Sequence, residues 1–209
     1  MPFPIILTGF LSGLALIVAI GAQNAYVLRL GLGARGRTIA AVVAVCALSD
    51  ALLICLGVAG IGALTQAAPA ALLVMRLAAI AFLLIYGALS LRRALRNTES
   101  LRAESLTPPR TWPAVVTVLA FTWLNPHVYL DTVLFLGSLA DGFGGQRWWF
   151  AAGAILASLI WFTALGFGAR LLRPVFAKAW TWRVLDGAIA VIMFVLAAGL
   201  IVELLGPGA

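Results

Sequence analysis

Charged residues are scarce in this chain. Only 10% of its 209 residues are Asp, Glu, Lys or Arg, whereas 64% are hydrophobic, and the mean hydropathy is +1.11. Ordinary soluble domains carry about 25% charged residues. A membrane-spanning helix needs about 20 apolar residues, and runs of this kind take up most of the chain. The composition leaves no room for a soluble domain and predicts an all-α, multi-pass membrane protein.

Histidine and cysteine are nearly absent as well. His127 is the only histidine, and the two cysteines, Cys46 and Cys55, lie nine positions apart in one apolar run. Nine helical residues rise about 13 Å, which is too far for a disulfide, so both cysteines are expected to be small packing residues. This inventory argues against a metal site. The sequence also lacks a glycine-rich phosphate loop before a lysine, so it predicts neither an enzyme nor a bound cofactor.

The first apolar run follows residues 1–4 (Met-Pro-Phe-Pro) without a basic region and without a small-residue cleavage site. It is therefore expected to be a retained span and not a signal peptide. The net charge of +7 could indicate nucleic-acid binding. The basic residues gather in the connections between spans, however, where membrane orientation explains them, so no nucleic-acid partner is expected.

Short polar connections separate six apolar segments. Nearly all the basic residues lie in or beside three connections, at residues 29–37, 92–112 and 172–182. With six spans these connections share one side of the membrane, and the positive-inside rule makes that side cytoplasmic and both termini external. A five-span arrangement with one re-entrant segment is the alternative. The six segments are 4–28, 38–63, 70–91, 113–139, 148–171 and 183–205.

A polar linker at residues 97–112 divides the chain into two three-span halves, residues 1–96 and 113–209. An odd number of spans per half means that the second half enters the membrane from the opposite side, so repeated halves would be inverted repeats. A short echo supports the repeat, because residues 23–28 (Gln-Asn-Ala-Tyr-Val-Leu) and residues 125–130 (Asn-Pro-His-Val-Tyr-Leu) both place an Asn in an apolar span. The first and fourth helices are expected to be broken or kinked there.

In the second half of the chain, the polar residues of interest lie in and just after residues 125–130 of the fourth segment. Proline removes a backbone donor and clashes with the preceding turn, so the helix is expected to kink or break at Asn125-Pro126. Backbone groups freed at membrane depth are tolerated only where they face protein or a wet cavity. Asp131 follows His127 by four residues, which places both on one helix face. A purely mechanical kink and a hydrogen-bonded interior histidine are the structural alternatives.

Asp50 is the anomaly of the first half. It is the only charged residue between positions 38 and 69, so its carboxylate is predicted near the bilayer midplane. A charge there costs roughly 2.5 kcal/mol or more and by default marks function. Gln23 and Asn24 follow Gly21 in the first span, where their amides could cap a broken helix or hydrogen-bond a ligand.

One further acid has a structural interpretation. Asp186 lies three residues after Arg183 at the predicted cytoplasmic end of the sixth span. That spacing suits a local ion pair on one helix. No other contact is expected of Asp186.

Several of these stretches resemble the lysine and arginine exporter family of the LysE/ArgO type. The resemblance covers essentially the whole chain, and its most specific part surrounds Asn125-Pro126. The family pattern usually has Pro at position 22, where this chain has Ala22, so the first span is expected to be less sharply broken. The stretches are residues 21–28 (GAQNAYVL), 48–50 (LSD), 68–69 (AP), 75–76 (MR), 122–131 (TWLNPHVYLD), 147–153 (RWWFAAG) and 158–162 (SLIWF).

The resemblance implies a secondary-active exporter of basic L-amino acids, L-arginine or L-lysine or both, in the inner membrane of a bacterium. Asp50 and Asp131 would meet the two cationic groups of such a substrate. Amides of Gln23, Asn24 and Asn125, or helix-end N–H groups, would meet its carboxylate.

Moving one positive charge outward against an inside-negative potential opposes export by about 2.3 kcal/mol per 100 mV. An inward-moving proton would cancel that electrical work. A buried carboxyl can hold either a proton or a bound cation, so Asp50 and Asp131, with His127 as a titratable neighbour, are predicted to couple protons to substrate.

Two other classes of function remain open. One is a proton-coupled exporter of another small solute, such as a neutral amino acid or a metal cation. The other is a non-transporting membrane scaffold whose acids only pair with arginines. The sequence does not choose between lysine and arginine, fix the coupling stoichiometry, or decide whether the protein forms a homo-oligomer in the lipid. Nor does it establish whether Asp50 and Asp131 share one cavity.

Overall fold

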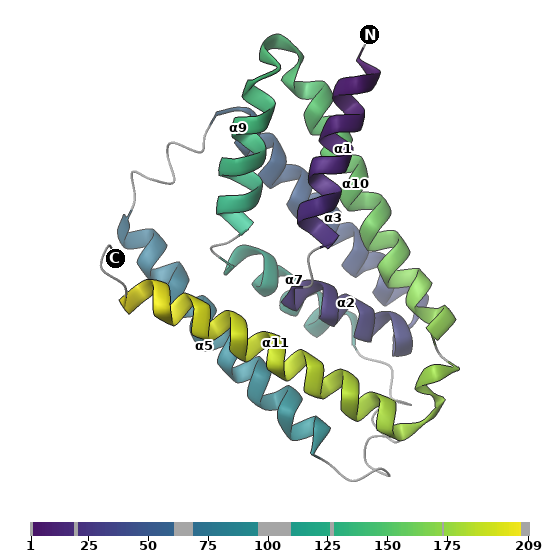
Figure 1. Ribbon diagram of the computed structural model, residues 1–209. Coiled ribbons are helices and arrows are strands. Elements are labelled where there is room, and N and C mark those ends of the chain that lie inside the picture. The colour runs from purple at the N-terminus through teal and green to yellow at the C-terminus, as the bar shows by residue number, and fades with distance from the viewer. Residues whose placement is uncertain are drawn as a thin grey trace.

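The computed structural model describes residues 2–18, 21–60, 69–95, 110–125, 128–172 and 174–205. Regular structure in these ranges is helical throughout, as the composition predicts (Figure 1). The longer helices are α1 (Phe3–Val18), α2 (Ala22–Gly33), α3 (Gly36–Val58), α5 (Pro69–Ala94), α7 (Thr111–Trp123), α10 (Arg147–Gly168) and α11 (Ala179–Leu205). The shorter ones are the π-helix η1 (Tyr129–Phe135), α9 (Leu136–Asp141) and the 3₁₀ turns η2 (Gly144–Gln146), η3 (Ala169–Leu172) and η4 (Val175–Ala177).

Four helical stretches in the described part of the chain are long and apolar enough to cross a membrane, and α1 with α2 makes a fifth candidate. The fourth predicted segment, 113–139, is divided between α7 and the η1–α9 stretch, and α7 alone is too short to span. An all-helical protein with several spans is therefore confirmed, and the count of six spans stays a prediction. The four stretches are Gly36–Val58, Arg76–Ala94, Gly144–Leu172 and Trp180–Val202.

Apolar side chains remain exposed along the outer faces of the helices. On α11, for example, Val184, Val191, Val195 and Val202 are all more than half exposed and recur at helical spacing. Exposed apolar surface of this extent marks contact with a partner or with lipid. A continuous stripe along a helix of this length suits the acyl chains of a bilayer.

The first apolar segment is broken, because the directions of α1 and α2 differ by 81°. Gly21 is the N-cap of α2, with φ −117° and ψ 172° in the extended region. The turn is sharp although Ala22 stands where the family pattern usually has Pro. Arg29, expected in the connection at 29–37, belongs instead to α2, because α2 continues for several residues beyond the predicted end of the segment. That placement of Arg29 in a loop is wrong.

The fourth segment is interrupted at the predicted position. α7 ends at Trp123, Leu124 and Asn125 lie outside helical structure, and the next described residue, Val128, is helical. Pro126 and His127 lie outside the described residues. The seven residues after Val128 form the π-helix η1, a wide helical turn that is rare and is often found at functional sites. Most of the predicted linker, residues 97–109, also lies outside the described residues, and Thr111 and Trp112 at its end begin α7.

Each broken segment packs against the middle helix of the other half. α1 and α2 contact α10, whereas α7, η1 and α9 contact α3. The middle helices α3 and α10 also pack on each other, and the last helices of the halves, α5 and α11, lie side by side as a pair (Figure 1). The two halves are therefore interlocked, since each completes the packing of the other.

Several helix seams are so close that they require glycine, and two of them are α1–α10 and α3–α9. A Cβ atom at Gly9 of α1 would overlap the carbonyl oxygen of Phe150, and one at Gly153 of α10 would overlap that of Ile6. On the other seam, a Cβ at Gly137 of α9 would lie 2.7 Å from the carbonyl oxygen of Gly57. Small residues of this kind let backbones approach in lipid, where helix association depends on van der Waals packing.

The buried core shows that α2 and α7 join two groups of helices. One cluster contains Val27 and Leu30 of α2 and Val118 of α7, together with residues of α3 and α10. A second contains Ala25 of α2 and Phe121 of α7, together with residues of α5 and α11. The short half-helices created by the two breaks therefore lie between the α3–α10 group and the α5–α11 pair.

The α1–α10 seam makes a first prediction. Gly153→Ala should destabilise the protein by about 1–3 kcal/mol, because the added methyl group must push α1 away from α10. Gly168→Ala, on the same helix, is the matched control, since no atom lies within 4 Å of a Cβ there. Thermal unfolding of the two purified variants in detergent tests this, and equal melting temperatures would contradict the close contact.

Candidate functional site

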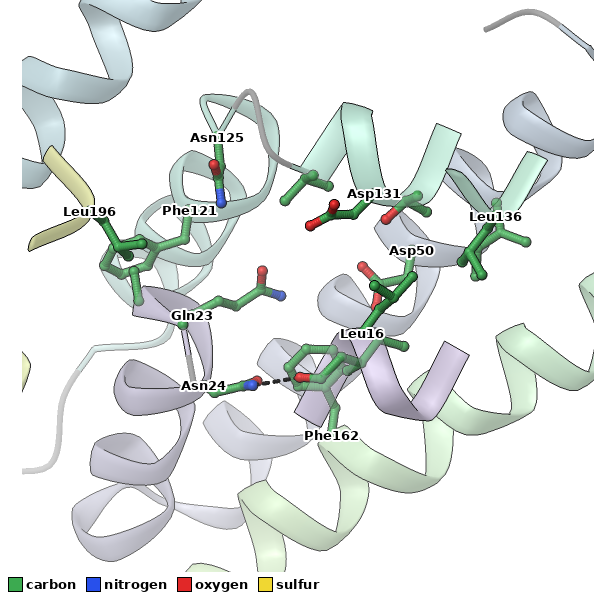
Figure 2. Close-up of a pocket in the computed structure, with 16 residues that line it drawn as sticks. Leu16, Gln23, Asn24, Asp50, Phe121, Asn125, Asp131, Leu136, Phe162 and Leu196 are labelled. Atoms are coloured by element: carbon green, nitrogen blue, oxygen red, sulfur yellow. Dashed lines mark hydrogen bonds between the residues drawn. The ribbon is translucent and has the colours of Figure 1, made fainter. Parts of the chain in front are cut away.

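A cavity of about 330 Å³ lies where the two broken segments meet. All five residues that the sequence proposes for substrate binding line it, although they come from α2, α3, η1 and the stretch that follows α7. Figure 2 shows the amides of Gln23 and Asn125 on one side of the cavity and the carboxylates of Asp50 and Asp131 on the other. Asp50 and Asp131 therefore share one cavity. The five residues are Gln23, Asn24, Asp50, Asn125 and Asp131.

Asp50 is held in place by the other half of the chain. It lies on α3, and only 8% of its surface is exposed. The hydroxyl of Ser158, fully buried on α10, donates a hydrogen bond of 2.6 Å to Asp50 Oδ2. Hydrogen bonds to a charged acceptor are stronger than neutral ones, and this one fixes the carboxylate at the edge of the cavity.

Asp131 is the more accessible acid. It lies in the first turn of the π-helix η1, where its side chain is exposed and lines the cavity beside Thr132. None of the described residues that line the cavity is Lys or Arg. Two carboxylates without a lining cation give the cavity a negative potential, which favours a positively charged ligand.

Gln23 presents a hydrogen-bond donor to the same space. Its side-chain oxygen accepts a hydrogen bond of 3.0 Å from the hydroxyl of Thr122 on α7. Its side-chain nitrogen is buried and has no hydrogen-bond partner in the described part of the chain. An unsatisfied buried donor costs about 1–3 kcal/mol, so a ligand oxygen at this position would recover that energy.

Asn24 has a different role, because both ends of its amide bind the protein. Its nitrogen donates a hydrogen bond of 2.6 Å to the carbonyl oxygen of Ile17, in the last turn of α1 (Figure 2). Its oxygen accepts one of 3.2 Å from the indole N–H of Trp161 on α10. The last carbonyls of a helix have no partner within that helix, so Asn24 stabilises the first break.

The second break is braced in the same way. The hydroxyl of Tyr129, just beyond the break, donates a hydrogen bond of 2.9 Å to the carbonyl oxygen of Trp123 at the end of α7. The indole N–H of Trp123 in turn donates one of 3.2 Å to Ser49, the neighbour of Asp50 on α3. The position of α7 is thereby tied to the helix that carries the buried acid.

Asn125 lines the cavity at the end of α7, but the expected contact between His127 and Asp131 lies outside the described residues. The described residues contain no group of three or more His, Cys, Asp and Glu that could hold a metal ion.

The remaining wall of the cavity is apolar. A volume near 300 Å³ is at the lower end of small-molecule pockets, and the first turn of α2 lines it. The cavity thus offers carboxylates, amide donors and a surface for methylene groups. Its large apolar residues are Leu16, Ile17, Ile54, Phe121, Leu136, Phe162 and Leu196.

The sequence alone does not indicate the residues that hold the polar groups in place. Ser158 and Trp161 lie 108 and 137 positions along the chain from the residues they bind, and Tyr129 binds Trp123 across the second break. Ser158 has one detectable signal, since it is the only Ser in the apolar run 148–171. Its pairing with Asp50 depends on the packing of α3 against α10 and leaves no local pattern.

The two amides of α2 should respond differently to substitution. Asn24→Ala should lower stability by about 1–3 kcal/mol, because it leaves the Ile17 carbonyl and the Trp161 indole without this partner. Gln23→Ala should cost less, since Thr122 keeps the carbonyl of Val118 within 3.1 Å. Melting temperatures of the two purified variants test this difference, and a larger loss for Gln23→Ala would contradict the assignment.

Known proteins match the chain over almost its full length. The description of the matching family, over residues 14–204, is LysE type translocator. The lysine exporter LysE of Corynebacterium diphtheriae is 37% identical over 228 residues, covering 95% of this chain and 99% of that protein. The arginine exporter protein ArgO of Serratia proteamaculans is 40% identical over 211 residues and covers 98% of both.

A Mycobacterium tuberculosis protein, provisionally named an amino-acid transporter, is 45% identical over 180 residues, covering 86% of this chain and 88% of that protein. No solved structure matches the chain. The match of the family over residues 14–204, together with these relatives, confirms the resemblance found in the sequence. This chain belongs to the LysE type translocator family.

Proposed function

We propose that the protein is a secondary-active exporter of basic L-amino acids, arginine or lysine or both, in the cytoplasmic membrane of a bacterium. The observation that carries the proposal is the pair of carboxylates, Asp50 and Asp131, that face one cavity at the meeting point of two broken helices. Relatives named lysine exporter and arginine exporter support the choice of substrate. A transporter needs no catalytic constellation, and the proposal includes none.

The cavity offers complementary groups to each part of a basic amino acid. The cationic side chain and the α-ammonium group would pair with Asp50 and Asp131. The α-carboxylate would lie at the first turn of α2, where the Gln23 nitrogen and the N-terminal end of the helix would attract it. The methylene groups would contact the apolar wall, including Phe121 and Phe162.

Proton antiport follows from the same two acids. Burial favours the neutral form of a carboxyl and a bound cation favours the ionised form, so proton and substrate compete for one group. Asp50 lies in the more enclosed position and Asp131 in the more accessible one. We assign proton binding to both, with His127 of the second break as a further proton carrier. Exchange of one proton for one monovalent cation is electroneutral.

The proposed architecture is a pair of inverted three-helix repeats with both termini outside. The contacts of the two breaks support it, because α1 and α2 pack on α10 as α7, η1 and α9 pack on α3. Close glycine contacts recur in matching places. Gly31 of α2 meets Gly166 near the end of α10, and Gly137 of α9 meets Gly57 near the end of α3.

Loss of either cavity acid should slow export strongly. Asp50→Asn and Asp131→Asn should each slow arginine efflux from loaded proteoliposomes by about tenfold or more, because a charge-assisted contact is lost. Asp141→Asn is the matched control, since this acid at the end of α9 has a side chain that is 79% exposed. Normal efflux through both cavity variants would exclude the proposed site.

Counterflow with labelled arginine, lysine, a neutral amino acid and a divalent cation should favour the first two substrates. Faster exchange of the neutral amino acid or of the metal cation would instead select the other exporter class. Absence of exchange for every solute would favour a non-transporting scaffold.

An imposed pH gradient should drive transport. With arginine inside the liposomes and an acidic medium outside, protons enter and efflux should accelerate over a control without the gradient. For a one-to-one exchange, a potassium diffusion potential set with valinomycin should leave the rate unchanged. Efflux that responds to the potential and not to the pH gradient would identify a uniporter.

A further inference from the structure

Three side chains at three-residue spacing lead along α2 away from the cavity. Gln23 lines the cavity, Tyr26 lies in an aromatic cluster, and Arg29 binds a buried acid. Each step of three residues advances about 4.5 Å along a helix. The three residues therefore mark successive layers between the cavity and the end of α2.

The middle layer is a cluster of four aromatic rings. Tyr26 of α2 packs against Tyr86 of α5 and Phe121 of α7, each with ring centroids 5.7 Å apart. Phe82 completes the cluster, with its centroid 4.8 Å from that of Phe121. Edge-to-face pairs of this kind are worth about 0.5–1.5 kcal/mol beyond their buried area. Because Phe121 also lines the cavity, the aromatic cluster forms part of the cavity wall.

The outer layer is an ion cluster around Asp186, whose side chain is fully buried. Arg29 Nη1 of α2 lies 2.6 Å and Arg93 Nε of α5 lies 3.2 Å from the same carboxylate oxygen, Oδ1. Arg93 also donates a hydrogen bond of 2.7 Å to Ser90, and its guanidinium lies 5.5 Å from the centroid of the Tyr86 ring. The expectation that Asp186 makes only a local pair with Arg183 is wrong, since α2 and α5 both reach it.

We infer that these two layers form the cytoplasmic gate of the transporter and that the contact between Arg29 and Asp186 is its lock. The inference rests on the orientation in the proposed function, which places the ends of α2 and α5 and the start of α11 at the cytoplasmic face. Opening requires Tyr26 and Arg29 to withdraw together, and both lie on the short half-helix α2. The gate is closed in this structure.

Arg93 explains how the contact between Arg29 and Asp186 can break without leaving the buried Asp186 carboxylate unpaired. An unpaired buried carboxylate is very costly. Arg93 belongs to α5, which packs along α11, so it can remain with Asp186 when α2 moves. While the gate is closed, the guanidinium groups of Arg29 and Arg93 place positive charge below the cavity. That charge repels a cationic substrate and opposes its leakage between cavity and cytoplasm.

Thiol labelling from each side of the membrane tests the gate. In a background with Cys46→Ala and Cys55→Ala, Thr132→Cys places one thiol in the cavity. Inside-out vesicles expose the cytoplasmic face to a membrane-impermeant maleimide. Arg29→Gln should raise the labelling rate about tenfold or more over the parent, because the closed state loses its lock. Arg29→Lys should give an intermediate rate.

Arg147→Gln is the matched control, because Arg147 makes an exposed pair at 3.7 Å with Asp141 at the opposite end of the bundle. It should leave cytoplasmic labelling at the parent rate. If a folded Arg29→Gln variant is labelled at the parent rate, the proposed lock is wrong. If that variant does not fold, labelling of Arg29→Lys at the parent rate would likewise show that the lock is wrong. Acceleration only in right-side-out vesicles would overturn the cytoplasmic placement.

The labelling measurement needs no transported substrate. If Arg29→Gln accelerates labelling but the protein transports neither arginine nor lysine, the proposed gate is supported and the proposed substrate is wrong. If the protein exports arginine but Arg29→Gln leaves labelling unchanged, the proposed substrate is supported and the proposed gate is wrong.

Discussion

Two apolar segments are interrupted in the part of the protein that the structure describes, and the freed backbone groups must find partners there. Water is excluded from the bilayer core, so an interrupted helix is tolerated only against protein or a wet cavity. At the first break the partner is the Asn24 amide, and at the second it is the Tyr129 hydroxyl, each bound to a carbonyl of the preceding half-helix. The cavity exists because both breaks are stabilised at the same place.

This arrangement gives the short helices α2 and α7 an unusual position. Both contribute to the core shared with α3 and α10 and to the core shared with α5 and α11. A shift of α2 would therefore change the cavity through Gln23, the aromatic cluster through Tyr26 and the ion cluster through Arg29. Site and proposed gate are coupled because one rigid element of three turns carries a part of each.

The sequence is informative where a local feature violates a strong rule. An acid in an apolar run identifies Asp50, and a proline with an Asn identifies the second break, because both are costly in a membrane. Together with the family resemblance, these signals select five of the six polar residues that line the cavity, and they miss Thr132.

Contacts between distant segments leave no such signal. The approach of Ser158 to Asp50 and of Arg29 to Asp186 depends on how whole helices pack. The direction of α2 is a further example. Its composition suits the end of a membrane span that leads into a loop as well as it suits a separate helix at 81° to α1. The glycine and arginine content of α2 gives the helix no direction in space, and its contacts with α10 and α11 have no local signal in the sequence.

The close seam between α1 and α10 has a consequence for the synthesis of the protein. α1 leaves the ribosome before α10, and the residues that its glycines fit belong to this helix, which is made about 130 residues later, or roughly 6–26 s at typical rates of elongation. Until then its packing face has only lipid or the insertion machinery as a partner. The first half of the chain therefore has to wait in the membrane, incompletely packed, for the second half to arrive.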